Sequence, residues 1–286
     1  MWIGNEATTM RDIHFTAGLL PGRAILRVEG FDAGSFLHNL VTADIEGLVQ
    51  GQASYAALLT PQGKILFDFF LMRHGESFLL DCSAAQKPEI LKRLGFYNLR
   101  SKVTISASED AVGVAPEEPE AELRYEDPRT PAIGWRYMTA SRSLADALDY
   151  ESARIALGLA DSDTDLGSAE YFPHEANLDQ LGGVSFTKGC YIGQEVVSRM
   201  EHRRSIRSRI LPVELDGSAP PKGTGIRAGE KQIGTMLSSI ETQALALIRL
   251  DRLAEATQPL LTDNFSITVL KPRWARYDVP GAKDIA

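Results

Sequence analysis

Alternating apolar and polar positions mark the first secondary-structure elements of this chain. Residues 23–30 alternate and predict a strand, and Asp32 then stands as a helix cap before the apolar positions of 36–41, which predict a short helix. Between residues 54 and 83, three apolar runs are separated by two segments with turn chemistry. This pattern predicts an antiparallel meander of three strands.

A mixed layer of strands and helix continues beyond the meander. Residues 90–94 place apolar side chains on one face of a helix, and a strand is predicted near 103–106. The segment 109–127 is rich in glutamate and proline, which favours an exposed connection over a core element. We therefore expect a boundary between structural units in this segment.

The second half of the chain changes from helical to β character. A strand is predicted around 132–137 and a helical tract over 144–159. Beyond Arg209, short alternating segments are divided by turn signals, and these segments are 210–215, 232–237 and 265–270. Their spacing predicts a small β-barrel or sandwich at the C-terminal end.

Composition favours a soluble protein of two or three domains. The chain has 286 residues, 44% hydrophobic and 24% charged. Its first residues lack the apolar core of a signal peptide, and no later stretch is apolar for long enough to span a membrane. We expect a cytoplasmic or organelle-matrix protein without a membrane partner. The net charge of −8 argues against a general nucleic-acid binder.

The cysteine count limits both disulfides and metal clusters. Only Cys82 and Cys190 occur, which is no disulfide framework and favours a reducing compartment. An iron–sulfur cluster held wholly by protein thiolates usually takes about four of them. Any cluster on this chain would need other ligands or a partner.

The segment Lys188 to Glu195, which reads KGCYIGQE, brings a thiol, two glycines, a cation and a carboxylate together. The glycines permit sharp turns on either side of Cys190, and the breaker-free run after Gly193 predicts a helix. Cys190 would then precede a helix N-terminus, where the dipole and Lys188 would favour the reactive thiolate. The alternative is a buried structural cysteine in a glycine-rich turn.

Five arginines, at positions 199, 203, 204, 207 and 209, follow this motif closely. They predict either a solvated helix end or an anion-binding site beside the cysteine. The five histidines, by contrast, are scattered without metal-ligand spacing, so we expect no zinc site.

The motif and its neighbours resemble the YgfZ-type folate-binding proteins, which are relatives of the glycine-cleavage T protein and help to maintain iron–sulfur enzymes. The resemblance rests on Asn177-Leu178, on residues 181–186 (LGGVSF), on the complete KGCYIGQE segment and on Arg199. Weaker similarity extends over roughly residues 12–272, including the Thr60-Pro61-Gln62-Gly63-Lys64 turn.

The resemblance implies an α+β fold in which three domains form a T-protein-like ring around a central folate channel. Two of these domains would be mixed α+β domains and the third a C-terminal β-barrel. The first would comprise residues 1–50 plus 110–205 and carry the KGCYIGQE motif, the second would be an inserted domain over 51–109, and the barrel would cover 206–286. The implied cofactor is tetrahydrofolate or a derivative, with its glutamate tail near the arginines.

The resemblance also implies the site residues. Cys190 would be the reactive group near the channel. The folate contacts would come from Asp68, Asn177, Lys188, Tyr191, Gln194, Glu195, Arg199, Arg203 and Arg204.

Two positions depart from the T-protein pattern. Its paired aspartates fall on Phe67 and Asp68, so the first of them, which has the catalytic role, is replaced by a phenyl ring here. Its folate-binding glutamate falls on Ala156. These departures disfavour aminomethyl transfer.

The sequence therefore predicts a folate-binding accessory protein for the assembly or repair of iron–sulfur clusters, with folate and iron–sulfur client or assembly proteins as partners. Whether it turns over a substrate is left open, as is its oligomeric state. One alternative is a folate-dependent aminomethyltransferase of the T-protein type. Another is a tRNA-modification factor, acting directly or through an iron–sulfur enzyme, although the net charge argues against direct RNA binding. The location would be the cytoplasm, or the mitochondrial matrix in a eukaryote.

Overall fold

A computed structural model describes residues 13–203 and 206–285 of the chain. Its first part is a five-stranded antiparallel sheet with the order β3-β4-β5-β2-β6. The strands are β2 (Arg23–Glu29), β3 (Ala53–Leu59), β4 (Ile65–His74), β5 (Ser77–Ser83) and β6 (Thr104–Ala107). The predicted meander is confirmed as β3, β4 and β5, because each pairs with the next.

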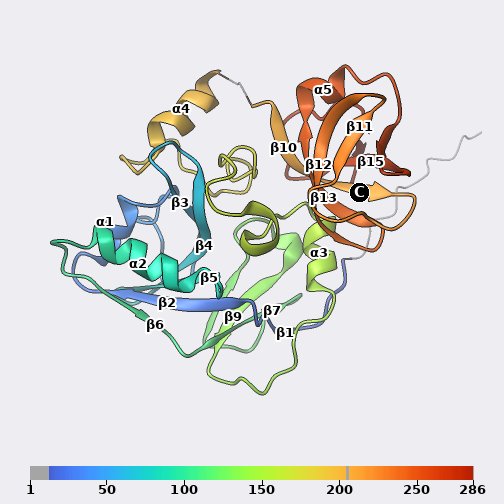
Figure 1. The fold of residues 1–286 in the computed structure, drawn as a ribbon. Coiled ribbons are helices and arrows are strands. Elements are labelled where there is room, and N and C mark those ends of the chain that lie inside the picture. The colour runs from blue at the N-terminus through green and yellow to red at the C-terminus, as the bar shows by residue number, and fades with distance from the viewer. Residues whose placement is uncertain (1–12, 204–205, 286) are drawn as a thin grey trace, which may run out of the picture.

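Two helices cover one face of this sheet (Figure 1). They are α1 (Ala33–His38) and α2 (Lys87–Tyr97). Leu37 of α1 and Ile90 of α2 are fully buried in one apolar cluster with alternate residues of β4, among them Phe67 and Phe69. The period-two alternation of β4 sends Asp68 to the opposite face.

A second antiparallel sheet has the order β1-β7-β9-β8. Its strands are β1 (Gly18–Leu19), β7 (Ala111–Ala115), β8 (Leu123–Glu126) and β9 (Trp135–Thr139). The prediction that 109–127 is an exposed connection is therefore wrong at both ends. Burial of Val112, Val114 and Tyr125 outweighs the acidic composition, and only the run between the strands is a surface turn.

The short helix η1 (Pro131–Ile133) joins β8 to β9 within this sheet. Irregular structure and two further short helices, α3 (Tyr150–Ala156) and η2 (Ser162–Leu166), lead toward the C-terminal part, followed after a long loop by α4 (Gln194–Arg203). The helix predicted over 144–159 is shorter than expected, because Asp149 has a left-handed backbone (φ 63°) that starts α3 only at Tyr150.

The C-terminal part is a closed β-barrel, as predicted. The strand order β10-β13-β12-β11-β14-β15 is closed by pairing of β10 with β15, and β16 extends the sheet. The strands are β10 (Ser208–Leu215), β11 (Gly225–Ala228), β12 (Lys231–Ile240), β13 (Gln243–Arg249), β14 (Leu260–Thr262), β15 (Phe265–Lys271) and β16 (Lys283–Asp284). Helix α5 (Leu250–Ala254) packs against the barrel, which has its own apolar core.

The three parts meet in a shared core. One apolar cluster includes Phe70 of β4, Val114 of β7, Ile155 of α3, and Leu237 and Leu245 of the barrel. Strand β2, which the predicted division gives to the first domain, pairs with β5 and β6 of the segment 51–109. The domain division itself stays a prediction. Among the described residues, no helix is long and apolar enough to cross a membrane.

Candidate functional site: a central cavity and an exposed cysteine loop

A cavity of about 430 Å³ lies where the first sheet, α3 and the barrel meet. Side chains from all three parts line it, including Arg23, Asp68, Phe70, Tyr150, Asp161 and Ile240. Its volume and its mixed aromatic and charged lining are typical of a small-molecule site.

Asp68 is the carboxylate that β4 directs into this cavity. It is only 4% exposed, and two hydroxyl groups donate hydrogen bonds to its two oxygens, that of Tyr55 at 2.9 Å and that of Ser162. Burial raises the pKa of Asp68, and the bond from Ser162 opposes that rise. Asp68 is thus a fixed acceptor that reaches the cavity.

The four arginines around the cavity are each paired with an aspartate. Arg23 and Arg136 both approach the Asp81 carboxylate at 2.7 Å. Burial acts to raise the pKa of Asp81, but the two arginines outweigh it and lower that pKa. Two further pairs, each at 2.8 Å, are Arg129 with Asp127 and Arg154 with Asp165.

The guanidinium groups of Arg136 and Arg129 also stack on Phe70, 4.4 and 4.9 Å from the centre of its ring. Asp68 differs from the paired aspartates, because its hydrogen bonds come from neutral hydroxyls. No sequence motif pointed to these ion pairs, because the partners are far apart along the chain.

Lys188 holds the cysteine loop to the first sheet. Its ammonium donates to the backbone carbonyls of His38, Val41 and Ala43 at 2.5, 2.8 and 2.9 Å, at and just beyond the end of α1. Burial lowers the pKa of Lys188 to about 8. The sequence predicted a cation that activates the thiol of Cys190, whereas the structure engages this cation with carbonyl groups.

Tyr191 and Gly193 anchor the other side of the loop. The Tyr191 ring is buried 5.4 Å from the Lys188 ammonium, and burial raises its pKa to about 12. Gly193 has φ 82°, and a side chain there would place Cβ 2.6 Å from the carbonyl oxygen of Thr60. Only glycine fits this turn, which confirms its predicted role.

Cys190 lies between these anchors and is exposed to solvent, just before α4. The other cysteine, Cys82, is fully buried, and burial raises its pKa to about 12. The reading of a buried structural cysteine therefore fits Cys82 but not Cys190. Because the chain has only these two cysteines, Cys190 is its one accessible thiol.

The remaining predicted contacts lie elsewhere in the molecule. Asn177, buried with φ 61°, donates to the Ile210 carbonyl at 2.7 Å and accepts from the Tyr277 hydroxyl at 2.8 Å, so it joins the middle of the chain to the barrel. On α4, Glu195 forms an exposed ion pair with Arg199 at 2.6 Å.

Gln194 is half-buried at the start of α4, and Arg203 is exposed at its end. Arg204 lies outside the described residues. Among the predicted site residues that the structure describes, only Asp68 lines the cavity.

The arginine cluster does not form one continuous anion site in the described residues. Arg209 is buried and binds both carboxylate oxygens of Asp179, at 2.5 and 2.9 Å. His174, Asp179 and Glu201 bring three potential ligand atoms within 4.8 Å, a grouping that sequence spacing missed. Because Arg209 already engages Asp179 and the His174 ring forms a hydrogen bond with Glu201 at 3.1 Å, we interpret this group as a polar network that ties α4 to β10.

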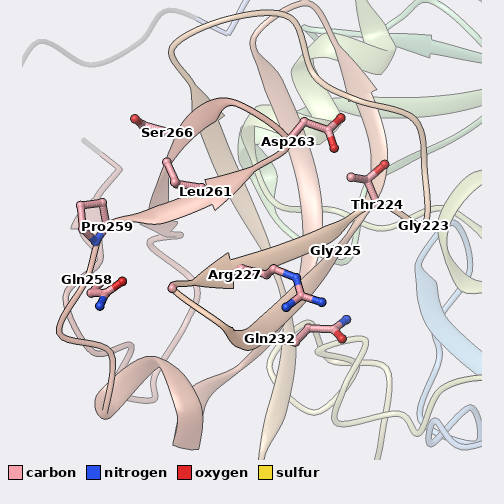
Figure 2. Close-up of a pocket in the computed structure, with 11 residues that line it drawn as sticks. Gly223, Thr224, Gly225, Arg227, Gln232, Gln258, Pro259, Leu261, Asp263 and Ser266 are labelled. Atoms are coloured by element: carbon pink, nitrogen blue, oxygen red, sulfur yellow. The ribbon is translucent and has the colours of Figure 1, made fainter.

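The barrel carries a hollow of its own, of about 770 Å³, around β11 and the loops beside it (Figure 2). Arg227, Gln232 and Asp263 are among its polar side chains. Arg227 donates to the Glu230 carbonyl at 2.9 Å. No motif of the sequence marks this hollow.

Comparison with known proteins first defines the class of fold. The glycine cleavage system aminomethyltransferase T from Bartonella henselae superposes with a TM-score of 0.75 at 16% identity, over 92% of this chain and 86% of that chain. Residues 23–115 match the family described as the GCVT N-terminal domain, and residues 207–277 match the CAF17 C-terminal beta-barrel domain. The predicted α+β, T-protein-like fold with a C-terminal barrel is confirmed.

The family follows from closer relatives. The chain is 34% identical to the mitochondrial iron-sulfur cluster assembly factor IBA57 of Mus musculus, over 80% of this chain and 79% of the relative. It is 33% identical to the Homo sapiens protein of the same name, over 80% and 76%. The chain belongs to the IBA57-type family of iron–sulfur cluster assembly factors. The YgfZ label predicted from the sequence names a related family and is not confirmed at that level.

Proposed function

We propose that this protein is an accessory factor for the assembly or repair of iron–sulfur clusters and that Cys190 is its reactive group. One observation carries the proposal: the only accessible thiol of the chain lies on a loop fixed by Lys188 on one side and by Tyr191 and Gly193 on the other. A thiol held in this way can meet a partner without first ordering its loop, which lowers the entropic cost of binding.

The cluster is cargo that this chain shares with a partner. One exposed cysteine supplies one thiolate, whereas a cluster held by thiolates takes about four. The remaining ligands come from an iron–sulfur client or assembly protein that docks on the cysteine loop. Phe186, which is 41% exposed four residues before Cys190, offers an apolar contact for that partner.

Tetrahydrofolate, or a derivative, fits the central cavity through Asp68. The Asp68 carboxylate can accept hydrogen bonds from the amino group and ring N–H of a pterin, and Phe70 and Tyr150 supply aromatic walls. When bound, a reduced folate supplies one-carbon carriage. Of the predicted contacts, only Asp68 is retained for the pterin. The other described ones do not line the cavity, and they are Asn177, Lys188, Tyr191, Gln194, Glu195, Arg199 and Arg203.

Two measurements separate the parts of this proposal. Cells that lack the protein and carry Cys190→Ser are expected to lose the activity of iron–sulfur enzymes, and activity equal to wild type would remove the role of the thiol. Calorimetry with tetrahydrofolate and folinic acid is expected to show binding that Asp68→Asn weakens and Arg203→Ala preserves. No heat with either folate on the wild-type protein would remove the cofactor.

A folate-dependent aminomethyltransferase is the second candidate. It is favoured only by the position of Asp68 in the cavity, and it is opposed by Phe67, which points into the apolar core beneath the helices. Steady turnover of a one-carbon donor by the purified protein, lost in Asp68→Asn, would favour this activity over the assembly role.

An indirect role in tRNA modification is the third candidate. Arg199 is paired with Glu195, and Arg209 is buried against Asp179. Among the described arginines of the cluster, only Arg203 and Arg207 are exposed without an ion pair, which is a small cationic surface for RNA. An effect on tRNA modification would then arise through an iron–sulfur enzyme that this protein maintains. Binding to RNA that weakens steeply as salt rises would contradict this view.

The location that we propose follows from the names of the relatives. The relatives from Mus musculus and Homo sapiens are named as mitochondrial proteins. We assign this protein to the mitochondrial matrix if its source is eukaryotic and to the cytoplasm otherwise. Cell fractionation with an antibody to the chain checks the assignment, and recovery outside these compartments would contradict it.

A further inference from the structure

Three large apolar side chains are exposed next to α1 and α2, two helices that lie on the side of the molecule away from the barrel (Figure 1). Phe31, in the turn between β2 and α1, is 93% exposed, and Leu99 and Phe96, at the end of α2, are 81% and 67% exposed. We call this region the Phe31 surface. Exposed apolar residues gathered in this way mark interaction sites more often than scattered ones do.

The two loops that carry these residues are fixed against each other. The Asp32 carboxylate accepts a hydrogen bond from the Lys102 backbone N–H at 2.7 Å. A side chain at Gly30, which has φ 121°, would place Cβ 2.2 Å from the Lys102 carbonyl oxygen. The loops therefore contact each other directly, and Phe31 is presented on ordered structure.

Charges of opposite sign flank the Phe31 surface. On the α2 side the exposed cations are Lys92, Arg100 and Lys102, with Glu89 as the acid beside Lys92. On the side of the β4–β5 turn the exposed acids are Glu46 and Glu76.

The cations on the acidic side are already engaged. Arg27 pairs with Glu29 at 2.9 Å, and Arg73 donates to the carbonyls of Gly75 and Leu48. Two hollows, of about 460 and 290 Å³, lie on this side, and Phe31 and Glu76 line both.

We propose that the Phe31 surface binds a second copy of this chain in a two-fold symmetric dimer. A two-fold axis through the apolar centre brings the basic side of each copy against the acidic side of the other, as an isologous interface requires. The hollows beside Phe31 then receive apolar side chains of the partner copy. An anionic membrane fits less well, because the acidic side would be repelled while the basic side is attracted.

Sedimentation velocity over a range of protein concentrations tests the dimer. The wild-type protein is expected to form dimers that weaken as salt rises, because the flanking charges are exposed. The variant Phe31→Ser/Leu99→Ser is expected to dimerise roughly tenfold more weakly or worse. The control Leu144→Ser/Leu148→Ser changes exposed apolar residues elsewhere and should dimerise as wild type does. A wild-type protein that stays monomeric overturns the proposal, including one that binds anionic vesicles as a monomer.

Charge reversal tests the symmetry. One variant carries Glu46→Lys/Glu76→Lys and the other Lys92→Glu/Arg100→Glu. Each alone is expected to be monomeric, whereas an equimolar mixture should form heterodimers, because the reversed sides become complementary in the mixed pair. All these positions are exposed, so equal urea midpoints for the variants and the wild type confirm intact folding. Heterodimers that fail to form from folded variants contradict a two-fold arrangement.

Discussion

The central cavity and the cysteine loop use buried charge in different ways. Around the cavity, buried arginines are balanced by buried aspartates, as in the pairing of Arg23 and Arg136 with Asp81. In the loop, the ammonium of Lys188 is held by neutral carbonyls, and the candidate reactive group is exposed. The paired charges hold the fold together. Of the predicted site residues that the structure describes, Asp68 lines the cavity and Cys190 is exposed to solvent.

Removing a buried charge beside the cavity should have the largest effect on stability. Asp81→Asn leaves Arg23 and Arg136 without their shared carboxylate, which should cost about 3–5 kcal/mol in the free energy of unfolding. The matched control is Asp251→Asn, which breaks the more exposed pair with Arg249 and should cost about 1 kcal/mol or less. Urea unfolding compares the two. Equal losses in the free energy of unfolding would mean that the charges around the cavity do not stabilise the fold more than surface ion pairs do.

Lys188→Met should have the next largest effect. It leaves three backbone carbonyls without their donor, and unsatisfied buried acceptors cost about 1–3 kcal/mol. The loosened loop should also change the rate at which iodoacetamide alkylates Cys190. Lys64→Met is the control, because Lys64 donates to one carbonyl only, that of Glu170 at 2.7 Å. If both variants lose the same stability and alkylate alike, Lys188 is not the anchor of the loop.

Asp68→Asn should change stability in a pH-dependent way. Burial raises the pKa of Asp68, so at pH values above that raised pKa the ionised carboxylate destabilises the folded state. At pH values below the ordinary pKa of 3.8 the group is protonated in both the folded and the unfolded state, and this destabilisation disappears. The variant should therefore gain stability relative to wild type at neutral pH and lose this gain in acid. Urea unfolding over this pH range measures it, and a gain that grows in acid would contradict the assignment.

The sequence predicted those features that depend on local pattern. Alternation identified the meander and the barrel, and the glycine and helix signals placed Cys190 before α4. The strands β7 and β8 were missed, because the acidic and proline-rich run between them dominates the composition there.

Long-range pairing explains the other misses. Arg136 meets Asp81 across 55 residues, and Lys188 meets His38 across 150, so no local motif could reveal either contact. For the same reason, the sequence grouped Lys188, Tyr191 and Asn177 with the ligand contacts, whereas the structure shows them engaged within the fold.

Cys190→Ser tests the central claim, because it removes the exposed thiol and leaves every anchor of the loop in place. Its unfolding should differ from wild type by no more than about 0.5 kcal/mol, since the residue is exposed. Complementation of cells lacking the protein, read as iron–sulfur enzyme activity at equal protein level, is the decisive measurement. We expect loss of that activity with Cys190→Ser and its retention with Cys82→Ala. Full activity of Cys190→Ser would contradict a role for the thiol.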